Sequence, residues 1–377
     1  MSESSPPVRV AVVGAGGIAR VAHLPALAAA GDAVQVVAVC DVDSGRADEL
    51  AEAHGVPGRY TVLADMLARE SPDLVVVATP PVAHREAVLA SLDAGAWVWC
   101  EKPPTLSLAE YDEITSRERD GGPYAAYVFQ HRFGGAARRL RRHIADGELG
   151  RPLVAVCNTL WYRGHDYFEV PWRGRWETEG GGPTMGHGIH QMDLLLHLLG
   201  DWHEVHAVAA TLDRRVQTED VSFAIVRFTS GAIGSIVNSV LSPRETSYLR
   251  LDFTDATVEV EHLYGYDDSH WRWTPAPHVT DSGRIAGWAP AGNTPSSHRA
   301  QLAALLAAMA AGERPPAAGA DGRRVLELIT GMYQSALTGR PVTRAELDEG
   351  NPFYHSLNGG DPPNATDRLQ QEETGRA

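Results

Sequence analysis

Residues 8–128 alternate short runs of β-branched residues with longer helical segments, and this alternation restricts the possible folds more than any other feature. Residues 8–14 (VRVAVVG) predict a fully buried strand, residues 18–30 a helix, and residues 34–40 (VQVVAVC) the next strand. Together they form a βαβ unit of about thirty residues. Further strands are expected at 73–79, 96–100 and 124–129, and helices near 47–54, 65–69, 84–94 and 107–119 separate the strands. The pattern predicts a parallel sheet covered by helices.

The chain changes character after about residue 150, where strand-like segments follow one another through tight turns. Residues 221–228 and 232–240 flank the turn Thr229-Ser230-Gly231, and residues 247–253 and 256–263 form a second such pair. Helices are expected at about 188–199, 297–311 and 321–337. The sequence therefore predicts an α/β domain at residues 1–128, an α+β domain with a large open, mainly antiparallel sheet at 129–350, and an extended or disordered tail at 351–377.

Composition and charge narrow the functions that the chain can have. The 377 residues include 33 Lys plus Arg and 48 Asp plus Glu, a formal net charge of −15, and 44% of them are hydrophobic. A balance this acidic repels nucleic acid and anionic membranes, and the basic run at 138–143 has the composition of a solvated helix face. The three cysteines, Cys40, Cys100 and Cys157, are widely separated, and no secretory leader or membrane-spanning run is found. We therefore expect a cytoplasmic protein with reduced thiols.

A glycine-rich turn, GAGGIA at residues 14–19, joins the first strand to the first helix and fits the pattern G-x-G-x-x-G/A. Gly14 permits the tight turn, and Gly16 lets the backbone approach a pyrophosphate. The helix N-terminus adds free N–H groups and a positive dipole. We therefore expect a dinucleotide-binding Rossmann domain in which Gly14, Gly16, Gly17 and Ile18 contact the cofactor.

Asp41 follows the second strand, at the place where a carboxylate can accept hydrogen bonds from the adenosine ribose hydroxyls. Its charge repels the extra phosphate of NADP, while Arg46 nearby softens that repulsion. The sequence therefore favours NAD and leaves NADP as an alternative.

Further motifs occur in the order and spacing of one known family. They are Thr79-Pro80-Pro81 with His84, Glu101-Lys102-Pro103, and GGGPTMGHGIHQMD at residues 180–193. Together with the segments at 172–182 and 335–342, they resemble the Gfo/Idh/MocA family of NAD(P)-dependent sugar and cyclitol oxidoreductases. The resemblance runs from about residue 8 to residue 342 and covers both predicted domains. It implies an NAD(P)-dependent dehydrogenase acting on CH–OH groups.

The resemblance also implies roles for individual residues. Lys102 is expected to reach the substrate hydroxyl and the nicotinamide ribose, because an ammonium at the carboxyl end of a parallel strand can stabilise a developing alkoxide. The other cofactor contacts implied near the strand ends are Thr79, Pro80, His84, Glu101 and Gln130.

One position departs from the family pattern D-x-G-x-H-x-x-D, whose first Asp and His form a proton relay. The later positions match, but Gly186 occupies the first Asp position. His190 remains the candidate general base, since imidazole titrates near neutral pH. The group that orients it is left open between His187, Asp193 and Lys102 acting without help, and His187 joins Lys102 and His190 as a catalytic candidate. The helix spacing of His190 and Asp193 would also suit metal ligands, but the family needs no metal and none is expected.

Aromatic and basic residues crowd the segment before the glycine run. Trp161 and Trp176 offer flat faces for a sugar ring, and Arg163 offers a partner for a carboxylate or phosphate. Asp193 is a further substrate candidate. The same tryptophans fit a subunit interface or a protein core equally well.

These observations predict hydride transfer between NAD(P) and a secondary alcohol of a sugar, a sugar derivative or a cyclitol. A non-catalytic NAD-sensing regulator, motivated by Gly186, and an NAD-dependent glycosidase acting by transient oxidation remain alternatives. The alternating apolar faces of residues 221–228 and 232–240 predict that a second subunit covers the open sheet, giving a homodimer or homotetramer. No nucleic-acid or membrane partner is expected.

Overall fold

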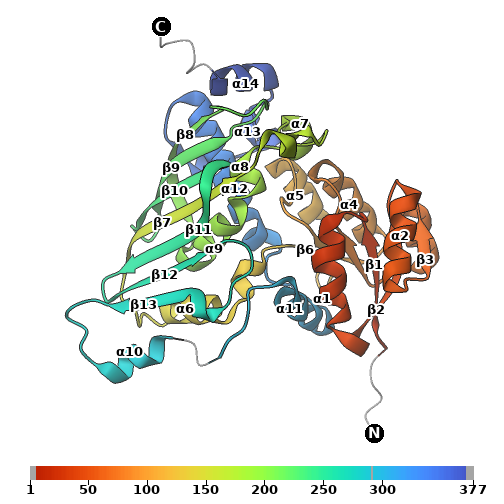
Figure 1. The fold of residues 1–377 in the computed structure, drawn as a ribbon, viewed down its shortest axis with the longest axis horizontal. Coiled ribbons are helices and arrows are strands. Elements are labelled where there is room, and N and C mark those ends of the chain that lie inside the picture. Colours follow the sequence, from red (N-terminus) through yellow and green to blue (C-terminus); the bar gives the residue numbers. More distant parts are fainter. Residues whose placement is uncertain (1–5, 290–291, 371–377) are drawn as a thin grey trace. The chain divides into compact units, whose positions relative to one another are not determined.

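The computed structural model describes residues 6–289 and 292–370, which form two compact units (Figure 1). The first unit contains the chain up to Thr105, Glu110–Val128 and His298–Gly322; the second contains Leu106–Ala109, Phe129–Ser297 and the chain from Arg323 onward. Residues 298–322 thus return to the first unit, against the expectation of a single boundary at residue 128. They do so because helix α11 (His298–Ala311) packs on helix α1 (Leu24–Ala28).

The first unit is built on a six-stranded, wholly parallel sheet in the order β3-β2-β1-β4-β5-β6. Its strands are β1 (Val8–Val13), β2 (Val34–Cys40), β3 (Gly58–Tyr60), β4 (Leu74–Val77), β5 (Trp97–Cys100) and β6 (Ala125–Tyr127). Its further helices are α2 (Ser44–His54), α3 (Leu63–Glu70), α4 (His84–Asp93) and α5 (Leu108–Arg117). This strand order is that of the doubly wound dinucleotide-binding fold, and the predicted Rossmann domain is confirmed.

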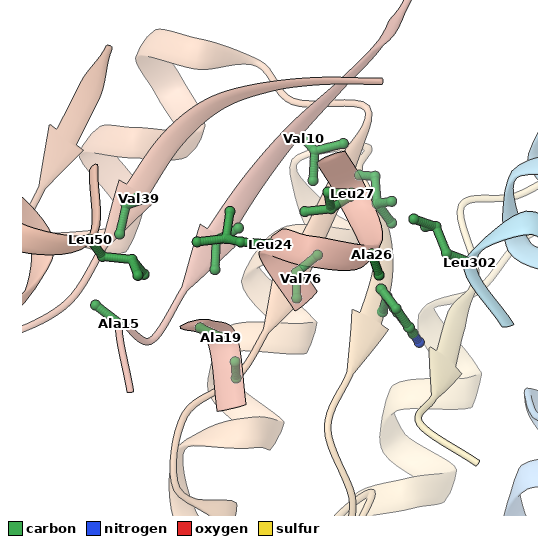
Figure 2. Packing of buried hydrophobic residues seen from close by; sticks show 14 of the residues in the cluster. Val10, Ala15, Ala19, Leu24, Ala26, Leu27, Val39, Leu50, Val76 and Leu302 are labelled. Atoms are coloured by element: carbon green, nitrogen blue, oxygen red, sulfur yellow. The ribbon is translucent and has the colours of Figure 1, made fainter. Parts of the chain in front are cut away.

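The core of the first unit lies between β1, β2 and β4 and the helices that follow them. Val10, Leu27 and Val76 are fully buried there, and Figure 2 shows Leu302 of α11 beside Leu27. The first helix differs from the continuous one predicted, because a π-helical turn, η1 (Ala19–His23), precedes α1. The wider turn directs His23 into the protein, where its side chain is wholly buried.

The second unit contains an eight-stranded sheet in the order β13-β12-β11-β7-β10-β9-β8-β14. All neighbours are antiparallel except β7 and β10, so the predicted open, mainly antiparallel sheet is confirmed. The strands are β7 (Pro152–Tyr162), β8 (Trp202–Ala210), β9 (Val221–Phe228), β10 (Ile233–Ser239), β11 (Leu241–Phe253), β12 (Ala256–His262), β13 (Trp271–Pro275) and β14 (Val342–Thr343). The helices are α6 (Gly135–Ala145), α7 (Trp176–Glu179), α8 (Pro183–Gly186), α9 (Ile189–Leu199), α10 (Ser282–Trp288), α12 (Gly319–Thr338), α13 (Pro352–His355) and α14 (Pro362–Gln370).

The two faces of this sheet differ in cover. Helices α8, α9 and α12 pack on one face, where Gly331 of α12 admits the ring of Trp202. The other face leaves apolar side chains more than 40% exposed at Val154, Val208, Phe223, Ile225 and Ile233. Because residues on a strand alternate between faces, β9 is apolar on both sides, as a covered strand would be.

The segment 351–377 was expected to be extended or disordered, and for residues 352–370 that expectation is wrong. Asn351 caps α13 by accepting a hydrogen bond from the Phe353 N–H, and Phe353 and Tyr354 are buried. In α14, Leu369 is buried and its carbonyl accepts from the Thr211 N–H at 2.9 Å. A few apolar side chains therefore dock a segment whose average composition is polar. Residues 371–377 lie outside the described part of the chain.

The cysteines are unpaired and buried, and burial raises the pKa of Cys40 to about 11 and that of Cys157 to about 12. No helix in the described ranges has the length and apolar character needed to span a membrane.

Candidate active site

The carboxyl ends of parallel strands meet at one edge of a sheet, and four of the predicted site segments follow such ends in the first unit. Gly14 follows β1, Asp41 follows β2, Thr79 lies two residues beyond β4, and Lys102 lies two residues beyond β5. The structure therefore gathers on one edge groups that are up to 88 positions apart in the sequence.

The glycine loop has a shape that only its own residues permit. Gly14 has φ +94°, and a Cβ there would lie 2.6 Å from the Ala78 carbonyl oxygen. Above Gly16 and Gly17 no atom lies within 4 Å of an added Cβ, and Ile18 is exposed. The loop is thus closed against β4 on one side and open on the other, as a pyrophosphate cradle must be.

Asp41 holds this loop in place. Its Oδ2 accepts a hydrogen bond from the Ala15 N–H at 2.7 Å, and its Oδ1 accepts from the Asp43 N–H at 2.9 Å. Each carboxylate oxygen retains a lone pair for a ribose hydroxyl. Arg46 is exposed and pairs with Asp43 at 3.5 Å, which reduces its capacity to offset the charge of Asp41.

Beyond β4 the predicted residues divide into open and internal groups. Pro80 is exposed, and the buried Thr79 Oγ1 has no hydrogen-bond partner among the described residues. His84 is 1% exposed and lies 2.7 Å from the Pro103 carbonyl through Nδ1 and 2.9 Å from the Thr79 carbonyl through Nε2. Burial lowers its pKa although both carbonyls favour the charged ring. Its ring ties two strand-end loops together inside the protein, and a contact of His84 with the cofactor stays a prediction.

Glu101 is the centre of a buried cluster that the sequence did not suggest. Its Oε1 lies 2.8 Å from His23 Nε2 and 3.3 Å from His298 Nε2, and its Oε2 accepts from the Lys102 N–H at 3.2 Å. Burial raises the pKa of Glu101, but the hydrogen bonds from the two histidines outweigh it, so the net pKa lies well below the usual range. Burial also lowers the pKa of His23. The cluster is an ionised carboxylate between imidazoles, and it fixes the backbone at Lys102.

These three side chains bring potential metal ligand atoms within 4.8 Å of one another. The separations of 2.8 and 3.3 Å are hydrogen-bond distances, and we assign no ion there.

Lys102 is half-buried, and it is the only lysine among the 377 residues. Every other basic side chain, apart from histidine, is an arginine, so position 102 is the one place where the chain offers a compact ammonium rather than a planar guanidinium. The single lysine is a signal that can be seen directly in the sequence.

In the second unit, His190 lies in the first turn of α9, and Gly188 precedes that helix. A Cβ at Gly188 would lie 1.9 Å from Asn238 Oδ1, so only glycine lets α9 start against β10. The His190 ring stacks on His131 with centroids 5.2 Å apart and an interplanar angle of 29°. This contact holds the His190 ring against η4 (Gln130–Phe133).

Asp193 does not have the surroundings of a substrate ligand. Its side chain is 0% exposed, and its two oxygens accept from the Arg132 guanidinium, at 2.6 Å for Nε to Oδ2 and through Nη2 to Oδ1. Arg132 is itself buried. The pair anchors α9 to η4, and the substrate role of Asp193 stays a prediction.

His187 lies beside the position of the missing Asp and is surrounded by aromatic and basic side chains. Tyr167 from η5 (His165–Glu169) places its hydroxyl 3.3 Å from His187 Nε2, and the Trp161 ring meets the imidazole edge-on at 5.3 Å. Gly186 itself lies near Glu179, whose Oε1 would be 3.6 Å from a Cβ at position 186. Of these neighbours, Glu179 was not considered from the sequence.

Arg163 and Trp161 occupy one patch near the end of β7. The Arg163 guanidinium lies over the Trp161 ring at 4.8 Å, pairs with Glu245 at 2.8 Å and donates to the Tyr264 hydroxyl at 2.6 Å. Trp161 Nε1 donates to Ser247 Oγ at 3.1 Å. The Arg163 charge is therefore already balanced within the protein.

Two remaining predicted residues have different surroundings. Trp176 is 4% exposed and packs edge-on against Tyr333, which favours the core alternative for this tryptophan. Gln130 is half-buried, its carbonyl accepts from Ser296 Oγ, and its buried Oε1 has no partner in the described ranges. This amide oxygen can therefore accept a hydrogen bond from a bound ligand.

The first unit fits a dinucleotide. The open cradle over Gly16 and Gly17, the available lone pairs of Asp41 and the unpaired Thr79 hydroxyl are the observations on which this fit rests.

Comparison with known proteins gives the same picture. Residues 8–125 match the model of the oxidoreductase family with an NAD-binding Rossmann fold, and residues 137–261 match the model of the GFO/IDH/MocA C-terminal domain. D-glucoside 3-dehydrogenase of Escherichia coli is 29% identical over 91% of this chain and 99% of its own length. Myo-inositol 2-dehydrogenase of Thermotoga maritima is 28% identical over 62% of this chain and 68% of its own length.

A solved structure extends this similarity to the whole fold. The WlbA dehydrogenase of Bordetella pertussis, in complex with NADH and UDP-GlcNAcA, is 27% identical and has a TM-score of 0.78 over 89% of this chain and 98% of that one.

Proposed function

The chain belongs to the Gfo/Idh/MocA family of oxidoreductases and acts as an NAD(P)-dependent dehydrogenase on CH–OH groups of sugars or cyclitols, and from this premise we propose that it prefers NAD and takes an uncharged ring as substrate. The observation that carries the proposal is the convergence of Gly14, Asp41 and Lys102 on one sheet edge, with open space above the glycine loop.

Each step of the proposed reaction has a group that can perform it. NAD, when bound, accepts or returns the hydride. Lys102 stabilises the oxygen as it gains negative charge, and the Glu101 cluster holds the Lys102 backbone. His190 takes the hydroxyl proton in its neutral form. The alcohol thereby loses one hydride and one proton and becomes a ketone.

The preference for NAD rests on Asp41. Its carboxylate is fixed by the Ala15 and Asp43 N–H groups, so it cannot swing away from an approaching 2′-phosphate. Arg46 is committed to Asp43. Like charges held at short range favour the cofactor without that phosphate.

An uncharged ring is supported by the arginines near Trp161. Arg163 pairs with Glu245 at 2.8 Å, and Arg173 has Glu179 at 3.8 Å. An anionic substrate would have to compete with these carboxylates. The face of Trp161 suits the apolar side of a sugar or cyclitol ring.

A second copy of the chain is the proposed cover of the open sheet. The exposed side chains of Val208, Phe223 and Ile225 lie on neighbouring strands β8 and β9, where a matching face can bury them. Replacing Phe223 by Asp is expected to convert a dimer or tetramer to monomers in light scattering. An unchanged mass would contradict the assignment of this face. We also propose a cytoplasmic location, which the three unpaired cysteines support.

The first test is NADH formation by the purified protein with a panel of aldoses, amino sugars, uronates and inositols. Lys102→Ala and Lys102→Arg are compared with the native protein, because Arg keeps the charge and removes the compact ammonium. Turnover that both variants lose supports the proposal, and turnover on uronates alone contradicts the uncharged ring. NAD binding without NADH release from any substrate would favour a redox-neutral glycosidase or a regulator.

The single lysine allows a second readout that does not depend on substrate. An amine-selective reagent can modify only Lys102 and the N-terminal amine. NAD is expected to slow modification of Lys102, measured by mass spectrometry, while the N-terminal amine reacts at an unchanged rate. Equal rates at Lys102 with and without NAD would place it away from the cofactor.

A further inference from the structure

A chain of polar contacts in the second unit leads from a buried carboxylate to His187. Glu179 Oε1 lies 3.8 Å from Arg173 Nη1. The Arg173 guanidinium stacks on the Tyr167 ring, with Cζ 3.7 Å from the centroid, and donates to the phenol oxygen. The Tyr167 hydroxyl lies 3.3 Å from His187 Nε2.

The donors and acceptors along this chain favour one order. Arg173 can only donate, so it occupies a lone pair of the phenol oxygen. The phenol O–H is then free to point at His187 Nε2, which accepts only when the ring is neutral at that nitrogen. With the Tyr167 hydroxyl as the donor, these contacts favour an imidazole that is unprotonated at Nε2.

Glu179 keeps the guanidinium in this place. Its side chain is 5% exposed, and its Oε2 accepts from the Gly174 N–H at 2.6 Å. Burial lowers the pKa of Arg173, the nearby Glu179 raises it, and Arg163 lowers it further. Without Glu179, two arginines would lie over the Tyr167 ring with one carboxylate fewer to balance them.

The same carboxylate lies against the glycine where the family pattern has an Asp. Because Glu179 Oε1 would be 3.6 Å from a Cβ at position 186, an Asp side chain there would bring a second carboxylate into the same space. Two carboxylates at such a separation repel each other. We therefore expect a carboxylate at position 179 or at position 186, but not at both.

We propose that Glu179 is a positioning residue that, through Arg173 and Tyr167, supplies to His187 the carboxylate that is absent at Gly186. This inference rests on the proposed dehydrogenase function for its kinetic readouts only. Of the two side chains considered as the orienting partner of His190, it favours His187, because both carboxylate oxygens of Asp193 accept from Arg132.

The charges around His187 come from several elements. Tyr167 faces the ring from η5, and Arg163, at the end of β7, lies 5.6 Å from the Tyr167 centroid. Arg173 and Glu179 approach from the segment before and within α7, and Glu245 of β11 balances Arg163. Removing the Glu179 charge leaves this group more positive, which disfavours a charged imidazole.

The test compares Glu179→Gln with Glu177→Gln, an exposed carboxylate on the same short helix. Glutamine keeps an acceptor for the Gly174 N–H and removes only the charge. For Glu179→Gln we expect kcat to fall about tenfold and the acidic limb of the kcat/KM profile to move to lower pH by about half a unit. NMR titration of His187 is expected to move in the same direction, and Glu177→Gln is expected to change neither.

Position 186 supplies the decisive comparison. Gly186→Asp alone is expected to lower kcat, whereas Gly186→Asp combined with Glu179→Gln is expected to recover activity relative to Glu179→Gln. Loss of thermal stability in Glu179→Gln with an unchanged pH profile and unchanged His187 titration would overturn the proposal, as would additive losses in the double variant. If Glu179→Gln does not fold, Tyr167→Phe must alter the His187 titration, and an unaltered titration refutes the chain of contacts. If no substrate is found, the titration still decides this point, so failure of the proposed function is distinguishable from failure of this inference.

Discussion

Replacement of Asp193 by Asn tests whether this carboxylate anchors the fold or binds substrate. The change removes a charge that is 0% exposed and leaves the buried Arg132 guanidinium, 3% exposed, with half of its bidentate partner. Breaking a buried ion pair from one side costs about 3–5 kcal/mol. At roughly 2–4 °C per kcal/mol for a unit of this size, Tm should fall by roughly 6–20 °C. Urea midpoints, followed by circular dichroism, measure the loss independently.

The control is the double variant Arg132→Met with Asp193→Leu, which removes both charges and keeps apolar volume. Because no unpaired charge remains buried, it should regain at least about half of the stability lost by Asp193→Asn. At a temperature where Asp193→Asn is folded, KM should stay within about threefold of the native value. A stable Asp193→Asn protein whose KM rises about tenfold or more would refute the anchoring role and restore Asp193 to the substrate.

Three further predictions concern the first unit. Gly14→Ala should distort the loop and lower Tm, because it combines φ +94° with a Cβ 2.6 Å from the Ala78 oxygen. A Cβ at Gly16 has no atom within 4 Å, so Gly16→Ala should keep the native Tm and weaken NAD binding, measured by calorimetry. Equal behaviour of the two variants would contradict the assignment of this loop as the pyrophosphate site. Asp41→Ser should lower kcat/KM for NAD by about tenfold, because it removes a charge-assisted hydrogen-bond acceptor. It should also raise the ratio of kcat/KM for NADP to kcat/KM for NAD, because it removes a charge that repels the extra phosphate. An unchanged ratio in initial-rate measurements would show that Asp41 does not select the cofactor. Burial lowers the pKa of His23 in the folded protein, so the unfolded chain binds more protons below about pH 6.5 and stability should fall as the pH drops through that region. The ionised Glu101 adds a loss of stability only at much lower pH. If the urea midpoint of His23→Gln changes with pH between about pH 7.5 and 5.5 as steeply as that of the native protein, His23 is excluded as the cause.

The sequence predicted those parts of the molecule in which local pattern and tertiary position coincide. The strand β4 is an apolar run that is buried throughout, and β1, β2 and β5 end in such runs, so their residues alone indicate a parallel sheet. Gly14 and Asp41 follow such strands directly, and their neighbours in space are fixed by strand order. The tail was wrongly predicted because Phe353, Tyr354 and Leu369 dock through a few contacts that average composition hides.

The partners of the site residues were beyond the sequence for a different reason. Nothing near Glu101 in the chain points to His298, which lies 197 positions away and approaches only because α11 returns to the first unit. Arg132 and Asp193 are 61 positions apart, and both belong to residue types that usually lie at the protein surface. Glu179 lies only seven positions before Gly186, but the two residues end different short helices, α7 and α8, and the sequence gives no hint that the Glu179 carboxylate lies 3.6 Å from a Cβ built at position 186.

The two units hold their candidate reactive groups by the same physical device. In the first, an ionised Glu101 is enclosed by His23 and His298, so the charge next to Lys102 is fixed inside the protein. In the second, Glu179 is enclosed by the Gly174 N–H and Arg173, and its effect reaches His187 through Tyr167. In both cases a buried carboxylate sets the surroundings of a nitrogen-bearing side chain without needing to touch substrate itself. Neutralising Glu101 should therefore alter the surroundings of Lys102, and neutralising Glu179 those of His187, so the two single losses in kcat should respond differently to pH.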